Sequence, residues 1–154
     1  MSHLSDHMNK FFSNGEGLDP STKNHVKKFV FYIEKFQSEK VDRLKAITVK
    51  DVQACVEYYH RQGSICTINS LENHLNALKA FFTYLHKNDM GDDIFHEVKD
   101  WSAFRQSMID SHGLIEGQFK GYLLDEDIIR LLDYFKTHPA EYPALSIYCK
   151  LMLL

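Results

Sequence analysis

The spacing of apolar residues between positions 67 and 87 constrains the fold more than any other feature of this chain. They follow one another at intervals of four, three, four and three residues: Leu71, Leu75, Leu78, Phe82 and Leu85. This spacing keeps one apolar stripe on a single face of an α-helix. Thr67 stands just before the stripe, where a hydroxyl can cap the first turn. The pattern predicts a long amphipathic helix with one buried face.

A second helix is predicted from Asp19-Pro20-Ser21 to about Ser38. Asp or Ser can accept a hydrogen bond from an unpaired backbone N–H, and proline is tolerated in the first turn of a helix. The residues that we expect on its buried face recur at helical spacing: Val26, Phe29, Val30, Ile33 and Phe36.

A third helix is predicted to begin at Thr48 and to end at Gly63, with Asp51 completing a short variant of the capping box. The residues that we expect it to bury are Val49, Val52, Val56 and Tyr59.

After Met90-Gly91 the chain becomes acidic, and further helices are expected beyond this connector. One ends near His112-Gly113, and its apolar residues are Val98, Trp101, Phe104 and Met108. Another is capped by Asp125 and stopped by His138-Pro139. Its expected inward residues are Ile128, Ile129, Leu131, Leu132 and Phe135. A last helix is expected from Ala144 to Leu154. It is almost wholly apolar, so we expect either that a partner covers its surface or that the natural chain continues.

These elements predict an all-α protein, because only three Pro and seven Gly interrupt 154 residues and no strand pattern stands out. Residues 1–19 are expected to be a flexible, non-helical N-terminus. Residues 20–112 are expected to form a compact bundle of about four helices. Residues 113–121 hold three Gly and read as a linker, or alternatively as a loop within one domain. Residues 122–154 are expected to begin a second unit.

The composition is that of an ordinary folded domain, with 44% hydrophobic and 25% charged residues. The three cysteines, Cys55, Cys66 and Cys149, show no C-x-x-C spacing and are odd in number, which favours reduced thiols in a cytosol. We find neither a signal peptide nor a transmembrane stretch in the sequence. We therefore expect a cytoplasmic protein without membrane partners.

The net charge of −3 hides an uneven distribution along the chain. Residues 1–19 carry −2, residues 20–87 carry +5 and residues 88–154 carry −6. A basic segment followed by an acidic one is expected when one part of a chain faces phosphate. Chance is the alternative, and the count alone does not separate the two.

Residue patterns typical of enzymes are missing from the sequence. His3 and His7 have the spacing of two metal ligands on a helix, but no third ligand is near and no helix is predicted there. Cys55 and Cys66 stand among apolar or capping positions, which favours packing over nucleophilic catalysis. The three Gly between 113 and 121 match no phosphate-binding loop. We expect no catalytic residue, no metal and no cofactor.

Polar residues opposite the leucine stripe are the best candidates for binding. This face is rich in amides and hydroxyls, which suit base edges and phosphates in a major groove. Its candidates are Thr67, Asn69, Ser70, Asn73, Asn76 and Lys79, with Thr83 beside them and Glu72 at the edge. The expected contacts to the DNA backbone are Lys23, Lys27, Lys28, Lys45 and Lys50. A solvated surface without a ligand is the alternative reading.

The order of these motifs resembles the core-binding domain of tyrosine recombinases, the phage integrase family. The similar segments are ITVKDVQACVEYY at 47–59 and SICTINSLENHLNALKAFFTYL at 64–85. Lys79, Phe81 and Phe82 stand where the family has a basic residue and two aromatics near the end of a Thr-capped helix. GYLLDEDIIRLL at 121–132 is similar to the segment that opens the family's catalytic domain. The Asn-Pro that often follows the third family helix is absent.

The resemblance implies a SAM-like helical domain that forms half of a C-shaped clamp around double-stranded DNA, with other recombinase subunits as further partners. In the family, a second domain supplies Arg, Lys, His, Arg and a nucleophilic Tyr, and none of these is assigned in this chain. Residues 122–154 would be the truncated start of that domain. The chain would therefore bind DNA without cutting it, and would need no cofactor. The alternative is an all-helical protein-interaction module that does not bind DNA productively.

Overall fold

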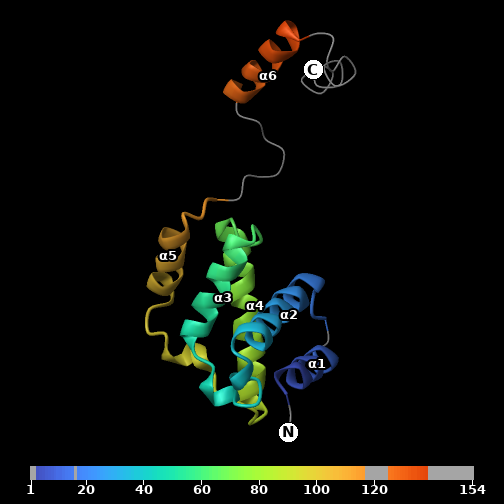
Figure 1. Ribbon diagram of the computed structural model, residues 1–154, viewed down its shortest axis with the longest axis vertical. Helices are drawn as coiled ribbons and strands as arrows, with labels where there is room; N and C mark the ends of the chain where they lie inside the picture. Colours follow the sequence, from blue (N-terminus) through green and yellow to red (C-terminus); the bar gives the residue numbers. More distant parts are fainter. Residues whose placement is uncertain (1–2, 16, 117–124, 139–154) are drawn as a thin grey trace. The chain divides into compact units, whose positions relative to one another are not determined.

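The computed structural model describes residues 3–15, 17–116 and 125–138, and the chain divides into two units, residues 1–117 and 118–154 (Figure 1). The first unit contains α1 (Leu4–Asn14), α2 (Pro20–Phe36), α3 (Val49–Arg61), α4 (Ile68–Lys87) and α5 (Trp101–His112). Three short 3-10 turns, Ser38–Lys40, Leu44–Ala46 and Ile94–Glu97, connect these helices. The second unit contains α6 (Asp125–Thr137). Within the described ranges there is no β-strand, so the predicted all-α class is confirmed.

Helix α4 lies at the centre of the first unit, packed mainly against α2 and also against α1 (Figure 1). Its side chains also contact Cys55 of α3 and Arg105 of α5. All five residues of the predicted stripe, from Leu71 to Leu85, are at most 1% exposed, as the spacing required. The predicted cap is also confirmed, since Thr67 Oγ1 accepts a hydrogen bond from the Ser70 backbone N–H at 3.1 Å. The stripe therefore fixes which side of α4 faces solvent.

The predicted starts of α2 and α3 are confirmed. Asp19 Oδ1 accepts a hydrogen bond from the Thr22 backbone N–H at 2.6 Å. Asp51 Oδ2 accepts from the Thr48 backbone N–H at 2.8 Å, and Lys40 Nζ donates to Asp51 Oδ1 at 2.8 Å. The bonds from Thr22 and Thr48 satisfy backbone N–H groups that a helix start leaves unpaired.

Phe36 corrects the predicted buried face of α2, because its side chain is 45% exposed. Phe36 is the last residue of α2, so no further turn of the helix covers its ring. The ring instead lies beside Tyr32 and Tyr58, with centroids 5.1 and 4.9 Å away. The other four predicted residues of that face are buried.

The expectation that residues 1–19 lack a helix is wrong, because Leu4–Asn14 forms α1. Leu4 and Phe11 are buried, and the Phe11 ring centroid lies 5.4 Å from that of Phe81 and 5.2 Å from that of Tyr84. The few apolar residues of this segment gave too short a periodic pattern to indicate a helix. Contact with α4 stabilises α1, and this contact cannot be predicted from the sequence of residues 1–19 alone.

Helix α5 ends where predicted, with Gly113 in the left-handed conformation at φ 61°. The next residues differ from the expected linker. Leu114 is 6% exposed, and the Ile68 backbone N–H donates to the Ile115 carbonyl at 2.9 Å. Residues 113–116 thus pack against the start of α4, and the remainder of the predicted linker, 117–121, lies outside the described residues.

The second unit contains the helix predicted to begin at Asp125. Phe135 is buried there as expected, whereas Ile129 is 58% exposed. Ile129 follows Ile128 by one residue, which turns its side chain about 100° away from that of Ile128. The helix expected from Ala144 to Leu154 lies outside the described residues. None of the described helices has the length and apolar character that crossing a membrane requires.

Candidate nucleic-acid interface

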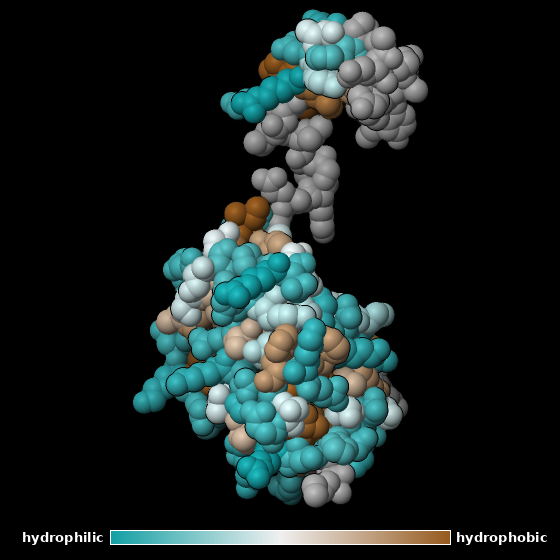
Figure 2. All heavy atoms as spheres, viewed as in Figure 1, coloured by the Kyte–Doolittle hydropathy of each residue, from teal (hydrophilic) through white to brown (hydrophobic). Residues whose placement is uncertain are grey.

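The outer side of α4 presents a stripe of amide side chains to solvent. Asn69, Asn73 and Asn76 are exposed and follow one another at intervals of four and three residues. Residues at this spacing are neighbours on one helix face. Hydrophilic residues also cover most of the visible face of the first unit in Figure 2. We call these three residues the amide stripe, and they lie on the exposed face of α4 opposite its buried apolar stripe.

Helix α5 lies along one edge of the amide stripe and makes two polar contacts with α4. Arg105 Nη1 of α5 pairs with Glu72 Oε1 of α4. About two turns further along α4, Lys79 Nζ lies 4.1 Å from the centroid of the Trp101 ring, at the distance of a cation–π contact. Lys79 is exposed, and its contact with Trp101 restrains its position against α5.

A shallow cavity of about 350 Å³ lies between α4 and α5 at this edge. Its lining combines an ion pair, an amide, a hydroxyl and an indole: Glu72, Leu75, Asn76, Trp101, Ser102 and Arg105. Sequence reasoning missed Arg105, Trp101 and Ser102 as members of this surface. Their spacing indicated only a helix, and the side of α4 on which that helix packs is a tertiary feature.

Thr67 and Ser70 are also predicted to contact DNA, but their hydroxyls form the hydrogen bonds that cap the start of α4. Ser70 Oγ donates to the Thr67 carbonyl at 2.9 Å, while Thr67 Oγ1 accepts from the Ser70 backbone N–H. Both side chains are half-buried. Their hydroxyls thus stabilise the start of α4.

The three predicted lysines of α2 lie in its first half, and two of them contact aromatic rings. Lys27 Nζ is 5.9 Å from the Phe12 ring centroid. Lys28 Nζ is 5.5 Å from the Tyr59 ring centroid and donates to Ser64 Oγ at 2.5 Å. Ser64 precedes α4 by four residues, so Lys28 lies near the start of α4. Lys23 stands one helical turn before Lys27.

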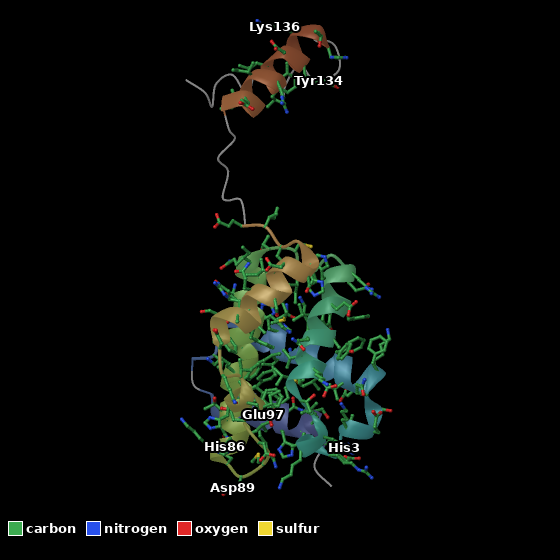
Figure 3. All side chains as sticks on the ribbon, turned by 90° about the vertical axis from the view of Figure 1, so that its left-hand side faces the viewer. His3, His86, Asp89, Glu97, Tyr134 and Lys136 are labelled. Atoms are coloured by element: carbon green, nitrogen blue, oxygen red, sulfur yellow. The ribbon has the colours of Figure 1, made fainter. Side chains whose placement is uncertain are left out.

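The structure does not bring Lys45 and Lys50 together with the α2 lysines. Lys45 lines an open cavity of about 810 Å³ with Asp89 and Met90, just past the end of α4. Figure 3 shows Asp89 at the same end of the first unit as His86 and His3. A 20-residue helix is about 30 Å long, which separates Lys45 from Lys28 by roughly that distance. Lys50 lines a groove between α3 and α5.

A buried polar cluster joins α2, α3 and α4 beneath this surface. His74 is fully buried, and its Nδ1 lies 3.2 Å from His25 Nδ1, while its Nε2 lies 3.9 Å from Cys55 Sγ. Burial, together with the charges of His25 and Lys28, lowers the pKa of His74 to about 3. Burial also raises the pKa of the Cys55 thiol. A neutral imidazole beside a protonated thiol is suited to packing rather than to nucleophilic catalysis.

The two N-terminal histidines have separate partners. His3 Nδ1 lies 2.8 Å from Asp42 Oδ1, and His7 Nδ1 lies 3.1 Å from Met90 Sδ. Across the residues with described positions, no three His, Cys, Asp or Glu side chains are grouped so that they could hold a metal ion. The amide stripe and its cations are therefore the best candidate site in this part of the chain.

Comparison with known proteins identifies the domain to which this surface belongs. The family model described as "Phage integrase, N-terminal SAM-like domain" matches residues 10–89, just over half of the chain. No curated protein and no solved structure gives a significant match. The matched range runs from within α1 to just beyond the end of α4, and includes the amide stripe. The chain belongs to the family of phage integrase N-terminal SAM-like domains, part of the tyrosine recombinases.

Proposed function

We propose that the first unit binds double-stranded DNA as the N-terminal domain of a tyrosine recombinase, with the amide stripe of α4 in the major groove. The observation that carries the proposal is the exposure of Asn69, Asn73 and Asn76 on one helix face, with Lys79 beside them. An Asn side chain can bond the N6 and N7 edge of adenine with two hydrogen bonds. An α-helix fits within the major groove of B-DNA.

Cations of α2 supply the contacts to phosphate in this proposal. Lys23 and Lys27 lie one turn apart, and Lys28 lies near the start of α4. Lysines that neutralise phosphates release counterions, which supports affinity without reading sequence. Lys45 and Lys50 receive no role, because they line other cavities and do not lie with the α2 lysines.

The proposal assigns DNA binding and no strand cleavage to this chain. The buried Cys55–His74 contact offers no reactive nucleophile. The proposed contacts to DNA are hydrogen bonds and ion pairs, which need neither a metal nor a nucleotide. In the family, cleavage requires an attacking Tyr together with Arg and His side chains. Mixing the chain with a duplex is therefore expected to give a complex without a covalent protein–DNA product.

Salt dependence of duplex binding tests the proposal. The logarithm of the association constant should fall linearly with the logarithm of salt concentration, as expected for phosphate contacts. The double variant Lys23→Ala/Lys27→Ala should reduce the magnitude of that slope by about 1.8, since each phosphate contact contributes roughly 0.9. The matched control Lys45→Ala/Lys50→Ala removes the same charge and should leave the slope unchanged. Absence of binding at low salt, or equal effects of both variants, would contradict the proposal.

A second candidate function, a protein-interaction module, is favoured by one observation near the end of α2. Phe31 and Phe36 are 49% and 45% exposed, and Lys35 Nζ lies within 5.6 Å of both ring centroids. Exposed aromatic rings beside a cation are common at protein interfaces. If this second function is correct, the chain should not bind DNA at low salt. It should form an oligomer in analytical sedimentation, and the double variant Phe31→Ser/Phe36→Ser should dissociate that oligomer.

A further inference from the structure

The Glu72–Arg105 ion pair lies at the edge of the amide stripe, where a carboxylate is unexpected. Glu72 is the only acidic residue of α4, and its side chain is 39% exposed. A lone carboxylate on a surface that approaches phosphate would repel the DNA. Arg105 compensates this charge from α5, with its own side chain 33% exposed. Both groups thus remain accessible to a ligand at the edge of the amide stripe.

The position of Arg105 is restrained by packing at the start of α5. Trp101, one turn before it, holds Lys79 over its ring and lies 5.7 Å, centroid to centroid, from each of Phe95 and Phe104. A guanidinium on a helix held in this way loses less freedom on binding than one on a mobile segment. The cavity between α4 and α5 leaves space beside the pair.

The ion pair has the hydrogen-bonding pattern that complements one G·C base pair. In the major groove, guanine presents two acceptors, O6 and N7, and its cytosine presents one donor, the N4 amino group. Arginine has five N–H donors, so its contact with Glu72 leaves donors for guanine. A carboxylate only accepts hydrogen bonds, and its remaining lone pairs suit the cytosine N4 amino group.

We propose that Glu72 and Arg105 together read one G·C base pair, with Arg105 donating to guanine and Glu72 accepting from cytosine. This inference rests on the proposed DNA binding and adds sequence specificity to it. Asn73 and Asn76 lie within one helical turn of Glu72, so adenine-containing pairs are expected within a few base steps of the G·C pair.

Selection from a random duplex pool with the full 154-residue chain tests this inference. The selected sequences should share a fixed G·C pair flanked by A·T pairs. With Arg105→Ala or Glu72→Gln, the preference for G·C at that one position should fall about tenfold or more, while the flanking preferences remain. Arg105→Lys retains the charge but cannot form the bidentate hydrogen bonds of a guanidinium. It should lose the preference for G·C at that position, with little change in the salt dependence of binding.

Arg61→Ala provides the matched control, because it breaks an exposed ion pair of α3 in which Arg61 Nη2 lies 2.6 Å from Glu57 Oε1. This control should leave every selected position unchanged. Thermal melting of each variant establishes that it is folded at the selection temperature. A purely structural pair would lower the melting temperature in Arg105→Ala and leave the selected bases as in the unaltered chain, which would overturn the inference. Salt-dependent binding without base preference would overturn it but not the proposed function, and absence of binding would overturn both.

Discussion

Acidification from pH 7.5 to 4.5 is expected to remove about 2 to 3 kcal/mol from the free energy of unfolding of the first unit. Burial lowers the pKa of His74 from 6.5 to about 3 in the folded state. The unfolded chain therefore binds a proton near pH 6.5 that the folded chain does not bind. The stabilisation is fully present above pH 6.5 and is lost as the pH falls towards 3. Burial also lowers the pKa of the neighbouring His25, which acts in the same direction.

The geometry explains why the folded state resists this proton. His74 Nδ1 lies 3.2 Å from His25 Nδ1, and a hydrogen bond between two imidazole nitrogens needs one of them without a proton. The charged groups around the pair are Lys28 on α2 and Asp19, which caps that helix, and Cys55 of α3 contacts the other side of His74. The positive charge of Lys28 lowers the pKa of both histidines. The negative charge of Asp19 acts in the opposite direction, raising the pKa of His25.

Urea unfolding at both pH values measures this effect. His74→Gln should show a much smaller difference between pH 7.5 and 4.5, whatever its stability at pH 7.5. His86→Gln is the control, because His86 is an exposed histidine of the same helix, and it should retain the full difference. The assignment to His74 fails when His74→Gln keeps the acid sensitivity of the unaltered chain.

Phe11→Ala is expected to cost about 3 to 5 kcal/mol of unfolding free energy. Its ring is 5% exposed and packs against Phe81 and Tyr84 of α4, so truncation leaves a cavity between α1 and the central helix. The matched control is Phe31→Ala, which removes the same side chain where it is 49% exposed and should cost less than about 1 kcal/mol. Denaturant titration of both variants measures the difference, and equal costs would contradict the packing of α1 on α4.

Sequence reasoning succeeded where the determinants of structure are local. The helix starts at Asp19, Thr48 and Thr67 depend on side chains within three residues of the cap, and the buried face of α4 follows from its spacing alone. Helix α1 was missed because its stability comes from contact with Phe81 and Tyr84, which are distant in sequence.

The candidate site was predictable only in part, for the same reason. Exposure of Asn69, Asn73 and Asn76 followed from the helical period of α4. The addition of Arg105, and the separation of Lys45 from Lys28, depend on how the helices pack against one another. Local patterns indicate which face of a helix is polar, whereas tertiary packing determines which other elements share that face.

Amide chemical shifts during titration with a duplex would test the central claim most directly. In nitrogen–proton correlation spectra of the full chain, we expect the largest changes at the side-chain amides of Asn69, Asn73 and Asn76 and at the backbone of Lys23 and Lys27. These groups lie on the proposed contact surface, and direct hydrogen bonds change amide shifts strongly. Changes confined to Phe31, Phe36 and Tyr58, or none at low salt, would contradict the account.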